Sequence, residues 1–254
     1  MRKRVFLTVA LVLLVAVVVS GCVTVSLGPS FGHNQGISVH GVGEQVSFPV
    51  AVDSFSAVEL NGQYEIVYRT SPVSAVRFEI HENLIEYLDI RVESGALSDT
   101  LIINSDVHFV RNSTPTVYIY APQLDSIRIS GASMFKDWDT LTAESLELNI
   151  SGAADGTLPL NVQSLSVVVA GAAGIQLEGS AVEASIMMAG AGNIAGGGLQ
   201  TQSSAVNITG AGSVNIAVSD TLNAQISGAG RVFYIGDPIV TQSVLGAGSV
   251  TRAR

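Results

Sequence analysis

The chain has 254 residues, of which 47% are hydrophobic and 13% are charged, and it carries a net charge of −9. This length suits one large domain or two ordinary ones. The negative charge argues against duplex nucleic acid as a partner. The chain contains one cysteine, Cys22, so it cannot form an internal disulfide framework.

The first 22 residues have the order of a secretory signal. Three basic residues precede an apolar run over residues 5–19, and small residues lead up to Cys22. This ending, Val19-Ser20-Gly21-Cys22, resembles the lipobox of a bacterial lipoprotein signal peptide. The resemblance implies that residues 1–21 are removed and that Cys22 is lipidated, which holds the protein outside the cytoplasm at the cell membrane or outer membrane. An uncleaved signal anchor over residues 5–27 is the alternative, because that stretch approaches the length of a membrane span.

Residues 22–47 are rich in glycine and lack sustained periodicity, which predicts a flexible tether. Two histidines, His33 and His40, lie in this segment. They do not have the set of neighbouring ligands that a metal site needs, so no metal is expected there.

Residues 48–123 alternate in the manner of β-strands but show no repeat. Asn61-Gly62 separates two alternating runs and predicts a tight turn between strands. Apolar residues at helical spacing predict a short helical turn within residues 81–89. We therefore expect an irregular β section that begins the same folded body.

Residues 124–254 contain a repeat with a period of about 20 residues. A Gly-Ala pair recurs at intervals of 18 to 21 residues, each time after a short alternating apolar run. The glycines are Gly131, Gly152, Gly171, Gly190, Gly210, Gly228 and Gly246. A fixed period of this length is typical of a solenoid, whose units stack on one another. We therefore predict an all-β fold, a parallel β-helix wound from a single chain. The handedness of parallel crossovers favours a right-handed coil.

The positions around each glycine divide into two sets. Two and four residues before it the side chains are mostly aliphatic, whereas the intervening residues are mostly polar or small. Alternation directs the first set inward, where stacked units form aliphatic columns, and the second set outward. Val168 and Met187 break the outer set and predict a small exposed apolar patch. Glycine is expected at the corner because a sharp turn needs backbone angles that other residues avoid.

Four segments carry a resemblance to a known family. They are residues 55–60, 82–88 and 117–124, and the serial Ser-Gly-Ala-Gly units such as residues 227–230. In this order they resemble the GIN domain, a head domain of auto-transporter adhesins in bacterial envelope proteins. The resemblance implies a parallel β-helix on the cell surface. It brings no functional residues with it, because the molecular role of the family is only loosely defined.

The candidate site with the most chemistry is Asp137 and Asp139, which flank Trp138 in the longest interval between repeat glycines. Alternation places both carboxylates on one face, at a spacing that suits an inverting glycosidase, and the indole could stack on a sugar. A polar loop with a packed tryptophan is the simpler interpretation, because later turns show no column of acids. No cofactor is expected: the glycine-rich run at residues 190–196 has no following helix to bind a nucleotide. No acidic column recurs for calcium either.

These observations favour a lipid-anchored cell-envelope protein that acts as a non-catalytic surface scaffold or adhesin-like binding module. Its expected partner is an envelope or surface protein or a glycan. Two alternatives remain: a carbohydrate-active β-helix enzyme, either hydrolase or lyase, and an envelope sensing or regulatory protein. The solenoid also predicts an open C-terminal end, because the last unit ends at Val250, four residues before the end of the sequence, with no capping segment after it. We expect either self-association through that end or a cap formed by Arg252 and Arg254.

Overall fold

The computed structural model describes residues 38–253, except 97 and 111. The predicted signal peptide, the lipidation of Cys22 and the tether up to residue 37 therefore lie outside the described residues. Within the described part of the chain, no helix is long and apolar enough to span a membrane.

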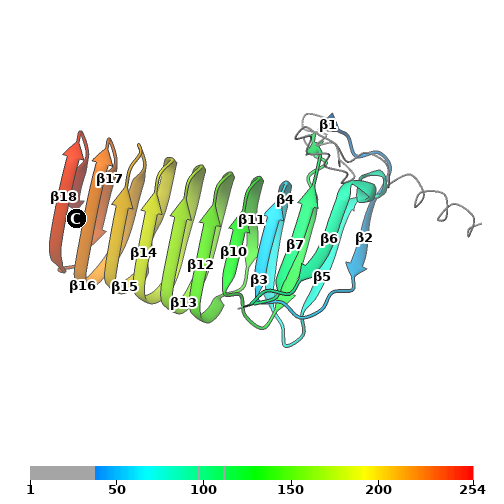
Figure 1. Ribbon diagram of the computed structural model, residues 1–254, viewed down its shortest axis with the longest axis horizontal. Helices are drawn as coiled ribbons and strands as arrows, with labels where there is room; N and C mark the ends of the chain where they lie inside the picture. The colour runs from blue at the N-terminus through cyan, green and yellow to red at the C-terminus, as the bar shows by residue number, and fades with distance from the viewer. Residues whose placement is uncertain (1–37, 97, 111, 254) are drawn as a thin grey trace, which may run out of the picture. The chain divides into compact units, whose positions relative to one another are not determined.

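The described chain is wound into a β-solenoid of about seven turns (Figure 1). Successive turns pair in parallel, residue against residue, through most of their length. The strands of this regular part are β10 (Ser126–Ile129), β11 (Ala132–Trp138), β12 (Leu141–Ile150), β13 (Ala153–Val169), β14 (Ala172–Met188), β15 (Ala191–Ile208), β16 (Ser213–Gly228), β17 (Arg231–Ile235), β18 (Ile239–Gly246) and β19 (Ser249–Arg252). The predicted parallel β-helix is confirmed.

The register of the turns produces the predicted inner columns. The residue two positions before each repeat glycine lies opposite its counterpart in the next turn. These side chains are at most 1% exposed in six successive turns: Ile129, Ile150, Val169, Met188, Ile208 and Ile226. Burial of such a column removes apolar surface from water in every turn, which is the main force that holds a solenoid together. Only the last member, Val244, is 37% exposed.

The outer positions follow the prediction as well. Val168 and Met187 lie opposite each other in neighbouring turns. Met187 is 52% exposed, while Val168 is half-buried. The alanine after each repeat glycine also faces outward and is exposed.

The reason for glycine at the corners differs from the one predicted. Among the seven repeat glycines, only Gly228 and Gly246 have a positive φ. At all seven, a Cβ would lie less than 3.0 Å from the backbone oxygen of the glycine one turn earlier. Close stacking of backbone on backbone therefore excludes every side chain at this column. Gly62 begins the column, so the predicted turn at Asn61-Gly62 is the first corner of the same solenoid.

The irregular section places antiparallel strands around the first turns. Its strands are β2 (Gln45–Val50), β3 (Ala57–Asn61), β4 (Gln63–Thr70), β5 (Ala75–His81), β6 (Leu88–Glu93), β7 (Thr100–Ser105) and β9 (Thr116–Ala121). β3 and β4 pair in parallel with β7 and β9 on one side and with β10 and β11 on the other. β5 joins β2 and β9, and β6 joins β7, all antiparallel. The 3-10 helix η1 (Glu82–Tyr87) confirms the short helical turn.

Residues 38–47 are not a free tether, so this part of the prediction is wrong. β1 (Ser38–Val39) pairs with β8 (His108–Phe109), and β2 pairs with β5. Between these strands, the Gly41 N–H donates to Ser113 Oγ at 2.8 Å and the Val42 N–H donates to Asn83 Oδ1 at 2.9 Å. Glycine content alone did not distinguish a segment that hydrogen-bonds to the body from a flexible one.

Candidate functional site

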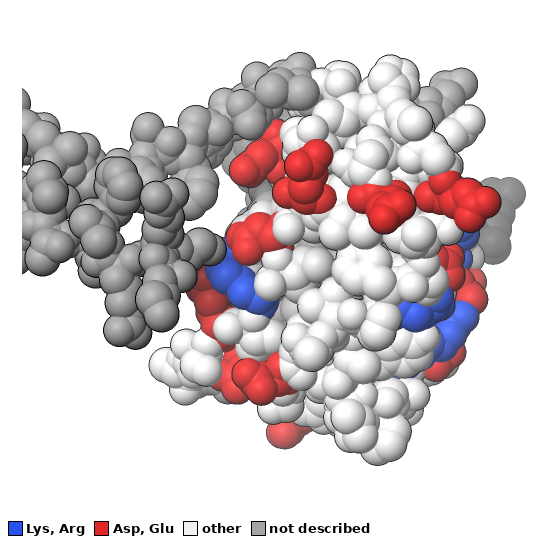
Figure 2. All heavy atoms as spheres, turned by 90° about the vertical axis from the view of Figure 1, so that its right-hand side faces the viewer, with Lys and Arg blue, Asp and Glu red and all other residues white. Residues whose placement is uncertain are grey.

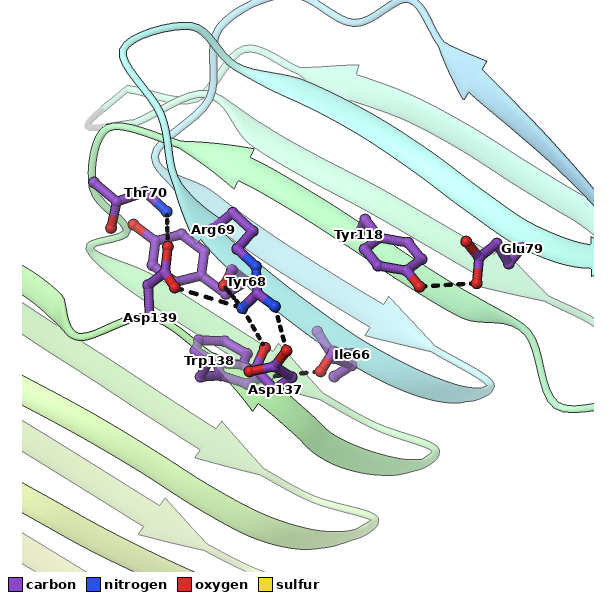
Figure 3. Close-up of polar contacts among 9 residues, drawn as sticks. All are labelled: Ile66, Tyr68, Arg69, Thr70, Glu79, Tyr118, Asp137, Trp138 and Asp139. Atoms are coloured by element: carbon purple, nitrogen blue, oxygen red, sulfur yellow. Dashed lines mark hydrogen bonds and ion pairs between the residues drawn. The ribbon is translucent and has the colours of Figure 1, made fainter.

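Four neighbouring strands carry a concentration of charged side chains on their outer surface. One row of paired residues runs across β5, β9, β4 and β11. In this row Arg77 pairs with Tyr118, Tyr118 pairs with Val67, and Val67 pairs with Asp137. We call this surface the charged face and define it by its polar residues: Glu65, Arg69, Arg77, Glu79, Tyr118, Lys136, Asp137 and Asp139. Three groups of contacts hold these residues in place. Figure 3 shows the first group and the Tyr118–Glu79 contact of the second.

The first group centres on Arg69, which holds both predicted carboxylates. Its guanidinium forms an ion pair with Asp137 and a second one with Asp139, where Nη1 lies 3.5 Å from Oδ1. The Thr70 N–H donates to the other carboxylate oxygen of Asp139 at 3.0 Å. A register shift after Phe135 accompanies this arrangement. The two acids do lie together, as predicted, but they point to an arginine rather than to an open cleft (Figure 3).

Trp138 packs into the same group. Its Nε1–H donates to the Ile66 carbonyl at 3.1 Å. Its ring centroid lies 5.2 Å from that of Tyr68 and 5.0 Å from that of Phe135, the latter edge-on at 80°. Aromatic pairs at these separations stabilise a fold beyond their buried area. The half-buried indole thus anchors the charged face to the core.

Electrostatics keep Asp137 ionised. Its hydrogen bond from Arg69 lowers the pKa of the carboxyl below its ordinary value. A general acid in glycoside hydrolysis needs the opposite shift, a pKa raised towards the working pH. Asp137 in this setting is suited to an ion-pair role rather than to proton donation.

The second group joins Glu79, Tyr118 and Arg77. Tyr118 donates its hydroxyl to Glu79 at 2.8 Å, and Arg77 donates to the other oxygen of the same carboxylate at 2.6 Å. The Arg77 guanidinium also lies 3.7 Å above the centre of the Tyr118 ring, a cation–π contact. The hydrogen bond from Tyr118 lowers the pKa of Glu79 and raises that of the phenol.

A third contact joins Lys136 of β11 to Glu65 of the neighbouring strand β4. The Lys136 Nζ lies 2.6 Å from a carboxylate oxygen of Glu65, and this hydrogen bond raises the lysine pKa. Thr116 donates to the same oxygen at 3.1 Å. Each charge on this surface is therefore oriented by a partner on an adjacent strand.

The sequence did not reveal Arg69, Arg77, Glu79, Tyr118, Glu65 or Lys136 as a group. Alternation within residues 64–68, 76–80 and 116–120 indicated that some of these side chains face outward. It could not indicate which strands lie next to one another. Among the described residues, no group of three or more His, Cys, Asp or Glu side chains is arranged to hold a metal ion.

Shallow grooves cross the surface of the solenoid. One, of about 290 Å³, is lined by residues that include Glu59, Arg128 and Asn149. Another, of about 380 Å³, runs between two outward columns dominated by serine and threonine, among them Ser185 and Thr221. Neither groove contains Asp137 or Asp139.

A family model described as "Putative auto-transporter adhesin, head GIN domain" matches residues 54–238. The chain belongs to this family. Membership supports an adhesin-like surface protein and agrees with the resemblance carried by the sequence motifs. A search of curated proteins gave no match.

Solved structures share the solenoid of this GIN-domain chain. A "putative adhesin" from Bacteroides fragilis NCTC 9343 has 21% identity and a TM-score of 0.76, with 85% of this chain and 100% of that chain covered. A "putative adhesin" from Parabacteroides distasonis ATCC 8503 has 23% identity and a TM-score of 0.68 over the same shares. A "Putative lipid binding protein" from the latter strain has 20% identity, a TM-score of 0.65 and the same coverage. At these identities the likeness shows the fold.

Proposed function

We propose that the protein is a lipid-anchored, extracytoplasmic, adhesin-like binding module that acts without catalysis, and that its charged face recognises another surface protein. The membership in the GIN family supports the adhesin-like role. The lipobox at Cys22 supports the anchor.

One observation carries the assignment to the charged face. Glu65 begins an outward column that continues as Met134, Asp155, Gly174, Asn193 and Ser213. The same column continues to Arg231, so the regular turns carry single charges on it. The charged face instead gathers seven charged side chains and Tyr118 on neighbouring strands. Arginine and tyrosine are enriched in the centres of protein interfaces, where they supply much of the binding energy.

The same contacts favour binding over catalysis. Arg69 engages both carboxylates of the predicted hydrolase pair, and the Arg69 hydrogen bond lowers the pKa of Asp137. Ion pairs that already orient their members present a preorganised surface, which reduces the entropy that binding must overcome.

An array of surface proteins and glycans probed with the protein tests this function. We expect a protein ligand whose affinity falls about tenfold in Arg77→Ala, because truncation of an interfacial arginine is commonly this costly. Arg231→Ala is the control, since Arg231 is an exposed arginine of a regular turn, outside the charged face. Equal losses in both variants would contradict the assignment, and a glycan as the sole ligand would correct the class of partner.

The enzymatic alternative has its own test. The protein is incubated with envelope and host polysaccharides, and reducing ends and unsaturated products are measured. We expect no release above that of Asp137→Asn. If the natural protein releases sugar products and Asp137→Asn does not, the non-catalytic role is wrong.

A further inference from the structure

β18, a strand of the last turn, exposes two large apolar side chains. β18 contains Ile239, which is 76% exposed, and Leu245, which is 70% exposed. They lie opposite Thr221 and Ser227 of the preceding turn. Outward positions that hold hydroxyl side chains one turn earlier therefore hold large apolar side chains here. Large apolar side chains at the end of a stack indicate a contact surface.

The edge of β18 is also unpaired. Within the described residues, β18 pairs with β16 and no strand pairs with its other edge. Its sequence, IVTQSVLG, contains no charge and no proline. Proteins usually protect a free edge with charged side chains or proline, because bare edges attract other strands.

The opposite end of the stack is protected in this way. Its edge strands are β2, which contains Pro49, and β6, where Arg91 forms ion pairs with Asp89 and Glu93. Figure 2, which looks onto this end, shows acidic side chains spread over it. The two ends are therefore unlike, and pairing of one copy's C-terminal end with another copy's first end is disfavoured.

The main-chain groups at the β18 edge can be assigned from earlier turns. In an earlier turn, Ser151 and Ala153 occupy the positions that Leu245 and Ala247 occupy in the last turn. The N–H groups of Ser151 and Ala153 donate to the turn before them at 2.9 and 2.8 Å. The Ala247 N–H likewise donates to the Gly228 carbonyl at 3.0 Å. Because successive residues of a strand direct these groups to opposite sides, Val240, Gln242 and Val244 present theirs to the free edge.

We propose that β18 pairs antiparallel with β18 of a second copy, about a two-fold axis at Gln242. In this register Val240 lies opposite Val244 of the second copy, and each such pair exchanges two main-chain hydrogen bonds. On the outer surface, Ile239 lies opposite Leu245 of the second copy. Gln242 faces its own counterpart, so the two side-chain amides can donate to each other.

The sequence of β18 is self-complementary, so a second copy of the chain fits its free edge. A two-fold interface requires that residue i meet residue j and that j meet i. The spacing of the apolar residues in β18 satisfies this on both faces with one register. Val240 and Val244 are equidistant from Gln242 on the inner face, and Ile239 and Leu245 are equidistant from it on the outer face. The pairing extends the inner columns of both copies through the joined ends.

A cysteine on the proposed axis tests this arrangement in the full-length chain in its membrane. Directly opposed residues of a hydrogen-bonded antiparallel pair have Cα atoms about 5.5 Å apart, which suits a disulfide. We expect mild oxidation to shift most of Gln242→Cys to twice the monomer mass on a non-reducing gel. The matched control is Gln225→Cys, an exposed glutamine of the preceding turn that lies off the axis. The fraction of Gln225→Cys at twice the monomer mass should not exceed that of the natural chain. The natural chain measures any cross-linking through Cys22.

A second variant tests the main-chain pairing. Gln242→Pro removes an N–H that faces the free edge and leaves the hydrogen bonds to β16 in place. We expect the molar mass of the detergent-solubilised chain, measured by light scattering, to fall about twofold relative to the natural protein. Circular dichroism checks that the solenoid is retained.

Three results would overturn the proposal. The first is absence of the disulfide in Gln242→Cys although a maleimide labels the introduced thiol. The second is a cross-link to a chain of another mass. The third is an unchanged molar mass in folded Gln242→Pro.

Discussion

The regular turns and the irregular section share one stack of rungs but differ in what their outer surfaces carry. From β12 to β16 every turn repeats a tight corner, a buried aliphatic column and outward residues that are mostly polar or small. In the irregular section, antiparallel strands and paired charges surround the first turns. The corner tolerates no side chain, so the repeat has little room for variation. Distinct chemistry accumulates where the repeat is interrupted.

The largest expected effect is at a corner. Gly171→Ala places a Cβ against the backbone oxygen of Gly152, which cannot move without displacing a whole turn. We expect the free energy of unfolding to fall by about 4 kcal/mol, measured by urea denaturation. Gly198→Ala is the control, because its Cβ would lie 3.3 Å from the side chain of Glu178 and no closer than 3.6 Å to a backbone atom. Similar losses in both variants would contradict the stacking explanation.

A smaller loss is expected at the anchor of the charged face. Trp138→Ala removes a half-buried ring between Tyr68 and Phe135, which should cost about 2 kcal/mol. Trp138→Phe keeps much of the packing and loses the hydrogen bond to Ile66, so about 1 kcal/mol is expected. Circular dichroism during denaturation measures both, since the variants lack the only tryptophan. If Trp138→Ala kept full stability but lost ligand binding, the indole would be a ligand platform instead.

The ion-pair group should contribute less. Asp139→Asn weakens contacts with Arg69 and with the Thr70 N–H, and we expect a loss of about 1 kcal/mol in the free energy of unfolding. Asp155→Asn serves as the control, because this exposed aspartate lies on a regular turn. A larger loss in the control would argue that the charged face adds nothing to stability.

The smallest effect is a pH dependence at Glu79. Its pKa is lowered in the folded state from an ordinary value of 4.5, so the folded state favours the ionised form. The resulting stabilisation is fully present above pH 4.5 and is lost as the pH falls through the lower folded-state pKa. Glu79→Gln should lower the melting temperature slightly at neutral pH, where this stabilisation is present, and flatten its decline as the pH falls from 4.5 through the folded-state pKa. If the melting temperature of the variant declines at acid pH as steeply as that of the natural protein, other carboxylates control this decline.

The regular turns were predictable from sequence because every repeat unit needs the same glycine corner and the same inward aliphatic residues. Spacing between glycines fixed the rung length, and alternation identified the buried columns, such as the one through Val169 and Met188. The cause of the glycines was not accessible, because close stacking of Gly171 on Gly152 looks the same in sequence as a positive φ. The charged face was missed for a different reason. Arg69 and Asp137 are 68 residues apart, and only the pairing of β4 with β11 brings them together.

The first long strand of the body and its last turn lie at opposite ends of the stack (Figure 1). Two copies joined through β18 then place their β2 ends at the two extremes of the joined stack, facing in opposite directions.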